Sequence, residues 1–164
     1  MQCTGFDGQR YTEELVLQYQ KDSNYALSLH GINTQSLKKI TEGVEKLPSI
    51  SSECVLPNKL YEIIENSDIG FLGLKLKEEN CQLLYGASGQ LLEFLRCGKP
   101  VISFGENNVG EMLEKYRAGI EIKKIEDLSQ AVLQIKNDYE TYSKNAYSLF
   151  LKDFDHTLLI RNLC

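Results

Sequence analysis

Several residue types are rare or absent in the sequence, and each shortage argues against one class of protein. Its 164 residues include no tryptophan, three prolines and two histidines, His30 and His156. Two histidines are too few for a histidine-rich metal centre, so we expect no bound metal. The five cysteines are an odd number without a Cys-x-x-Cys pair, which argues against a disulfide framework or a zinc site. We therefore expect reduced thiols and a cytoplasmic protein.

Long hydrophobic runs and an excess of positive charge are also missing. The longest apolar runs, at residues 69–74 and 101–104, are far too short to span a bilayer. Aspartate and glutamate (23) outnumber lysine and arginine (18), and the net charge of −5 argues against a nucleic-acid binder. Hydrophobic residues make up 42% of the chain, enough for one packed core. We expect a single domain over residues 1–164.

Short β-type runs alternate with segments of helical spacing. Strands are predicted at residues 25–29, 52–56, 69–76, 101–104 and 120–122. Helices are predicted at residues 11–21, 34–47, 59–66, 88–96, 109–117 and 128–136, and the pattern stays helical from there to Cys164. Gly98 and Gly119 each follow a helix and are expected to end it in a left-handed conformation. The alternation predicts an α/β fold, a Rossmann-like parallel sheet with helices on both faces and C-terminal helices.

In such a fold, ligands bind where strands end and helices begin, and loops 5–8, 30–33 and 85–90 qualify. Loop 85–90 is the most informative, because Gly86-Ala87-Ser88-Gly89 is small and directly precedes an apolar helix. The free N–H groups and partial positive charge of a helix start suit a phosphate. Glu93, one turn later, is placed to accept hydrogen bonds from a ribose diol. Helix capping by Ser88 explains the same spacing, and on spacing alone we favour the cap.

The stretch 91–102, Leu-Leu-Glu-Phe-Leu-Arg-Cys-Gly-Lys-Pro-Val-Ile, resembles the signature of the GT-B glycosyltransferases. In that family a glutamate-bearing helix ends at a small-residue turn, and Gly-Lys-Pro-Val-Ile enters a strand. Residues 60–71 and 108–128 resemble the family's neighbouring helix and strand stretches, in the correct order. The resemblance covers roughly residues 56–135. It implies the C-terminal, nucleotide-sugar-binding half of a group 1 or family 4-like enzyme, whose N-terminal acceptor-binding domain is absent from this chain.

The resemblance also implies roles for individual residues. Glu93 matches the glutamate that holds the ribose of the nucleotide. Ser88, Gly89 and Gln90 match the loop whose backbone amides contact the diphosphate.

Three further positions match less closely or depart from the family. Leu56 matches the position where backbone groups meet the base. Arg10 loosely matches a basic residue that neutralises phosphate, but we favour the simpler explanation of an exposed arginine at a helix start. Retaining members often carry a second glutamate eight positions before the one that matches Glu93, and here that position is Tyr85. The catalytic residues and the stereochemical outcome therefore stay unassigned.

The function implied by the resemblance is transfer of a sugar from a UDP- or GDP-sugar to an acceptor hydroxyl, in glycan or polysaccharide synthesis, without a metal or other cofactor. We expect this half to bind the donor with little turnover alone, and its exposed apolar surface to permit a homodimer. The alternative is a non-catalytic α/β module that binds a nucleotide or a protein. A phosphoacceptor receiver domain is disfavoured, because no acidic pair ends the first strand.

Overall fold

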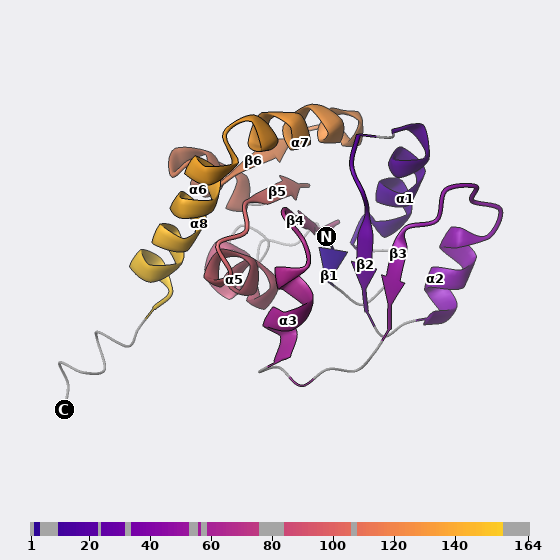
Figure 1. Ribbon diagram of the computed structural model, residues 1–164, viewed down its shortest axis with the longest axis horizontal. Helices are drawn as coiled ribbons and strands as arrows, with labels where there is room; N and C mark the ends of the chain where they lie inside the picture. Colours follow the sequence, from indigo (N-terminus) through magenta and orange to yellow (C-terminus); the bar gives the residue numbers. More distant parts are fainter. Residues whose placement is uncertain are drawn as a thin grey trace.

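A computed structural model describes residues 2–3, 10–22, 24–31, 34–52, 56, 59–75, 84–105 and 108–155. Within these ranges six parallel strands form two sheets of three, in the orders β1-β2-β3 and β4-β5-β6. The strands are β1 (Gln2–Cys3), β2 (Ser28–His30), β3 (Ser49–Ser51), β4 (Gly70–Gly73), β5 (Val101–Phe104) and β6 (Gly119–Ile122). Because β1 contacts β4, the strands follow the order 3-2-1-4-5-6 of the doubly wound fold (Figure 1).

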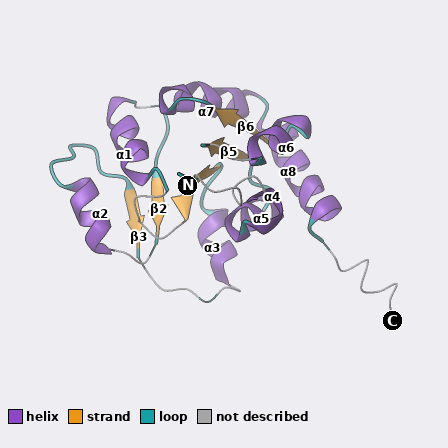
Figure 2. Cartoon of the chain, turned by 180° about the vertical axis from the view of Figure 1, so that it is seen from behind, coloured by secondary structure: helices purple, strands orange, loops and turns teal. Residues whose placement is uncertain are grey.

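Helices cover both sides of these sheets (Figure 2). They are α1 (Thr12–Lys21), α2 (Thr34–Thr41), α3 (Leu60–Glu65), α4 (Leu84–Ala87), α5 (Gly89–Arg96), α6 (Val109–Lys115), the 3-10 turn η3 (Ile125–Asp127), α7 (Leu128–Asn137) and α8 (Tyr139–Asp153). The predicted fold class, a parallel α/β structure with C-terminal helices, is confirmed. No helix in the described ranges is long and apolar enough to cross a membrane.

The two faces of the sheet carry separate hydrophobic clusters, because successive strand residues point to opposite sides. Phe71 and Ile102 pack with α1 and α7, whereas Leu72 and Val101 pack with α3, α5, α6 and α8. All four residues of β4 are buried, as expected for a central parallel strand. This double burial explains why residues 69–74 and 101–104 form the longest apolar runs in the sequence.

Several predicted elements differ from the structure in their bounds, among them the strand predicted at 25–29, which is Ser28–His30. The helix predicted at 34–47 ends at Thr41, because Gly43 adopts a left-handed conformation (φ +74°) that stops it. The structure has a strand at Ser49–Ser51, directly after Pro48, which cannot continue a helix. Of the strand predicted at 52–56, the two ends are not in a strand, and residues 53–55 lie outside the described ranges. β1 and α4 were not predicted, because elements of two and four residues are too short to show a period.

Of the two glycines predicted to end helices, only one does so in the structure. Gly98 is left-handed (φ +64°) and follows α5 as expected. Gly119 does not end α6; Arg117 takes the left-handed conformation there (φ +50°). Gly119 lies within β6, where a Cβ would come 2.0 Å from the carbonyl oxygen of Val101, so close strand pairing requires glycine.

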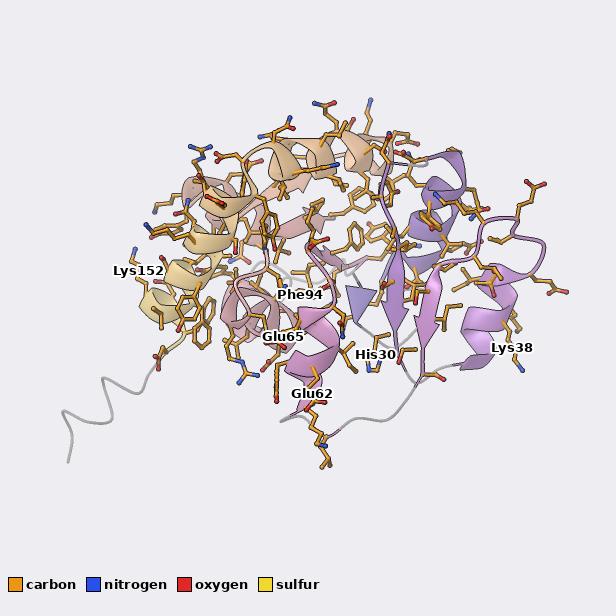
Figure 3. All side chains as sticks on the ribbon, viewed as in Figure 1. His30, Lys38, Glu62, Glu65, Phe94 and Lys152 are labelled. Carbon is orange, nitrogen blue, oxygen red and sulfur yellow. The ribbon has the colours of Figure 1, made fainter. Side chains whose placement is uncertain are left out.

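Helix α5 lies against β4 through one tight contact. The Phe94 side chain is fully buried, and a Cβ on Gly70 would lie 2.5 Å from its Cδ2 atom. Figure 3 shows Phe94 in the interior of the molecule. Glycine at position 70 therefore sets how closely the helix approaches the strand.

We predict that Gly70→Ala lowers the free energy of unfolding by about 1–3 kcal/mol, because the added methyl group overpacks the Phe94 contact. Gly86→Ala is the matched control, since a Cβ at Gly86 meets no described atom within 4 Å. Alanine within α4 should leave stability unchanged or raise it. Urea denaturation of both variants tests this, and equal stabilities would contradict the packing role of Gly70.

Candidate functional site

The amino end of α5 is capped and open to solvent. The Ser88 hydroxyl accepts a hydrogen bond from the Leu91 amide at 3.2 Å, so the predicted cap is confirmed. The first α-helical bond runs from the Leu92 amide to the Ser88 carbonyl at 3.0 Å. The amides of Gly89 and Gln90 therefore point out of the helix end. A Cβ on Gly89 would meet no described atom within 4 Å, which leaves room for a ligand beside these amides.

The starts of α5 and α1 meet at the carboxyl end of β4. The Gln90 side-chain amide donates to the Phe71 carbonyl at 3.3 Å, which holds the start of α5 against the strand. Two residues along β4, a Cβ on Gly73 would lie 3.1 Å from the Arg10 carbonyl oxygen, so the backbone before α1 adjoins the same strand. The strand order reverses between β1 and β4, which is where doubly wound folds bind their ligands. The structure thus gathers Arg10, Ser88, Gly89 and Gln90 at one edge.

Two side chains at this edge were not predicted. Tyr11 adopts a left-handed conformation (φ +54°), unusual for an aromatic residue, and its ring centroid lies 4.5 Å from that of Phe104. Lys75, just after β4, lies 4.9 Å from the Tyr11 ring centroid and pairs with Glu14 at 2.5 Å. Lys75 and Glu14 are each about one-third exposed, so an ammonium group is available at the strand end. The sequence signal for this ammonium group is a lysine that directly follows a buried strand.

Glu93 lies one helical turn into α5 and is not free. Its Oε2 atom accepts a hydrogen bond from Arg96 Nη2 at 2.6 Å, and its side chain is 20% exposed. Helix-surface pairs of this spacing are worth about 0.3–0.5 kcal/mol. A ribose diol can therefore compete for the carboxylate at small cost, and the ion pair holds Glu93 in place when no ligand is bound.

Solved structures share the fold of this chain. HepE from Anabaena, in complex with UDP-glucose, matches with a TM-score of 0.75 and 13% identity over 99% of this chain and 46% of its own. WaaG, a glycosyltransferase involved in lipopolysaccharide biosynthesis, matches with a TM-score of 0.67 and 16% identity over 98% and 45%. The N-terminal domain of Candida albicans trehalose-6-phosphate phosphatase matches with 0.57 and 13% over 93% and 37%.

The chain has the fold of one half of a GT-B glycosyltransferase. It spans less than half the length of the HepE and WaaG chains. No protein-family model and no curated protein sequence matches it.

Tyr85, which the sequence resemblance aligns with the second glutamate of retaining GT-B enzymes, serves a structural role. Its backbone amide donates to Asn108 Oδ1 at 3.0 Å, and its hydroxyl donates to Asp153 Oδ2 at 2.8 Å. Its ring lies 5.2 Å from that of Phe154. Burial, reinforced by the Asp153 carboxylate, raises the pKa of Tyr85. The residue ties α4 to α6 and α8 and cannot replace a carboxylate that contacts the sugar.

The remaining GT-B positions are described only in part. Leu56 is 65% exposed and its carbonyl accepts from the Lys59 amide at 2.8 Å, while residues 53–55 and 57–58 lie outside the described ranges. Loop 5–8, residues 32–33 and His156 also lie outside them. His30, at the end of β2 in Figure 3, is buried with Nδ1 3.2 Å from Ser51 Oγ, so it is a hydrogen-bonded structural residue.

We predict that Ser88→Ala lowers the melting temperature by about 2–4 °C, because loss of an N-cap costs about 1 kcal/mol. Ser88→Thr retains the hydroxyl acceptor and should melt close to the wild-type temperature. Differential scanning calorimetry distinguishes the two variants. Identical melting of Ser88→Ala and wild type would show that the Leu91 amide does not depend on this cap.

Proposed function

We propose that this chain is the donor-binding half of a GT-B glycosyltransferase and that it binds a nucleotide-diphosphate sugar, a UDP-sugar before a GDP-sugar. The observation that carries the proposal is the open amino end of α5, placed at the carboxyl end of β4 where the strand order reverses. The preference for uridine is supported by HepE, which was crystallised with UDP and with UDP-glucose.

The diphosphate is the chemical group that suits the start of α5. The amides of Gly89 and Gln90 donate to phosphate oxygens, and the helix dipole favours negative charge at the same point. Arg10 and Lys75 supply positive charge from the loops after β1 and β4. During transfer the bond between the sugar and the phosphate breaks, and the leaving diphosphate gains charge. Fixed amides and nearby cations stabilise that charge without reorganising.

Glu93 and Leu56 complete the proposed nucleotide contacts. The Glu93 carboxylate accepts hydrogen bonds from the ribose hydroxyls in place of its bond to Arg96. The backbone near Leu56 meets the base. No metal is assigned, because helix amides and cations provide the charge compensation.

The reaction itself is proposed for a longer protein. The HepE chain is more than twice as long as the part matched here, which leaves room for an acceptor-binding domain. Helix α8 exposes Tyr147 and Leu151, 47% and 43% accessible, and we assign this apolar surface to contact with that domain. A homodimer through exposed apolar surface stays a prediction. No catalytic residue is assigned.

We predict that UDP at 1 mM raises the melting temperature by about 5–10 °C if it binds with a dissociation constant near 10 μM. The reason is that a ligand that binds only the folded state stabilises it in proportion to the logarithm of its concentration. Thermal-shift measurements with UDP, GDP and ADP make the comparison. No shift with any of them would favour the non-catalytic protein-binding module instead.

We predict that Glu93→Ala weakens UDP binding by about 10- to 100-fold in isothermal titration calorimetry, because hydrogen bonds from the ribose to a carboxylate are lost. Arg96→Ala is the matched control, since it breaks the same ion pair but keeps the carboxylate. Its affinity should equal that of wild type or be up to about twofold higher. Equal weakening by both variants would mean that the ion pair, not the ribose contact, is what matters.

A further inference from the structure

The start of α5 follows α4, the short helix Leu84–Ala87, with only Ser88 between them. A helix of four residues cannot hold its own position, because forming the first turn fixes several residues for a single hydrogen bond. Gly86 and Ala87 are exposed, and a Cβ on Gly86 or on Gly89 would meet no described atom within 4 Å. The local sequence therefore leaves α4 and the start of α5 loosely placed, and contacts with other elements must fix them.

Tyr85 makes such contacts with two different helices. Its backbone amide donates to Oδ1 of Asn108, the residue before α6, at 3.0 Å. Its hydroxyl donates to Oδ2 of Asp153, the last residue of α8, at 2.8 Å, and its ring lies 5.2 Å from that of Phe154. Figure 2 shows α4 beside α5, near α6 and α8. The side chain of Tyr85 thus connects α4 to a helix that lies 68 positions further along the chain.

The last turn of α8 is itself held in place. Helix α8 packs on α5 through a shared cluster of buried residues, and the Ser143 hydroxyl donates to the Gly98 carbonyl, just after α5, at 2.8 Å. The Phe154 amide donates to the Phe150 carbonyl at 2.9 Å and closes the helix end around Asp153. The packing of α8 on α5 therefore sets the position of the Asp153 carboxylate.

The hydrogen bond between Tyr85 and Asp153 is of a strong kind. A hydroxyl that donates to an ionised carboxylate forms a charge-assisted bond. Both residues are partly buried, so water competes less for the two groups. Burial raises the pKa of Tyr85 and the Asp153 carboxylate raises it further, so the hydroxyl keeps its proton and remains a donor.

We propose that Tyr85 is a positioning residue of the donor site, because its hydrogen bond to Asp153 fixes α4 and thereby the amides at the start of α5 that receive the diphosphate. Helix α8 then controls the affinity for the diphosphate. It does not control the affinity for the nucleoside, which contacts Glu93 and the backbone near Leu56. This inference rests on the proposed function, since it concerns the same amides.

The test compares Asp153→Ala with Asp153→Asn, which remove the same negative charge. The asparagine amide oxygen still accepts from the Tyr85 hydroxyl, whereas alanine offers no acceptor. Asp153→Ala and Tyr85→Phe should each weaken UDP binding by about 5- to 20-fold in isothermal titration calorimetry, because binding must then order the amides. Asp153→Asn should stay within about twofold of wild type. Uridine, which lacks the diphosphate, should bind every variant within about twofold of wild type in NMR titrations.

Two further readouts separate positioning from a general loss of stability. The double variant Tyr85→Phe/Asp153→Ala should weaken UDP binding no more than either single variant, because both changes remove the same bond. In the chain without nucleotide, Tyr85→Phe should speed amide exchange of Leu91 and Leu92, which form the first hydrogen bonds of α5, at least about fivefold. The Cys97 amide, bonded at the other end of α5, should exchange at its wild-type rate.

Failure of this role and failure of the proposed function give different results. If UDP binds the wild-type chain, and Tyr85→Phe and Asp153→Ala leave its affinity unchanged, the role of Tyr85 is overturned while the proposed function stands. Equal weakening of UDP and uridine, or equal weakening by Asp153→Ala and Asp153→Asn, would also overturn the role. A wild-type chain that binds no nucleotide would overturn the proposed function, and the donor-site role of Tyr85 with it.

Discussion

The contact between Phe94 and Gly70 is the constraint on which the candidate site depends. It lets the Phe94 side chain of α5 lie directly on the backbone of β4 at Gly70. The position of α5 in turn fixes Ser88 at its start and brings Gln90 within reach of the Phe71 carbonyl. A helix held further from the strand would move the Gly89 and Gln90 amides away from the edge where the strand order reverses. A packing requirement in the core thus fixes the position of the helix start where we propose that a phosphate binds.

The sequence predicted the elements that are marked by local boundary residues or by a strongly apolar face. Strand 101–104 and helix 88–96 are bounded by Gly98 and Pro100, and their buried faces give clear periods. β3 and β1 could not be predicted in this way. Each has two or three residues, and each exists because a neighbouring backbone pairs with it, which no local pattern encodes. Arg117 likewise ends α6 in a left-handed conformation that its residue type does not favour.

The residues of the candidate site likewise fall into two groups, those with a local sequence signal and those without one. Ser88 as a cap follows from its position before an apolar helix, and the structure confirms it. Lys75 and Tyr11 could not be assigned, because their meeting requires the loops after β1 and β4 to adjoin in space. The ion pair of Glu93 with Arg96 could be predicted from helical spacing. The proposed binding of a ribose by Glu93 also depends on its side chain being four-fifths buried, which the sequence does not indicate. Tyr85 aligns with a family glutamate, yet its hydrogen bonds to Asn108 and Asp153 give it a structural role that the alignment does not indicate.

A cavity of about 520 Å³ lies at the amino edge of the strands, and the polarity of a parallel sheet explains why the cavity and the proposed nucleotide site lie apart. All the crossover helices begin at the carboxyl edge of the strands, so their free amides and partial positive charge gather there. At the amino edge the same helices end, and carbonyls carry the opposite partial charge. Asn66 and Ser67, just past α3, line the cavity together with Asp68, and Lys136 is a cation on its wall. An anionic diphosphate is therefore favoured at the carboxyl edge, although the cavity is at the amino edge.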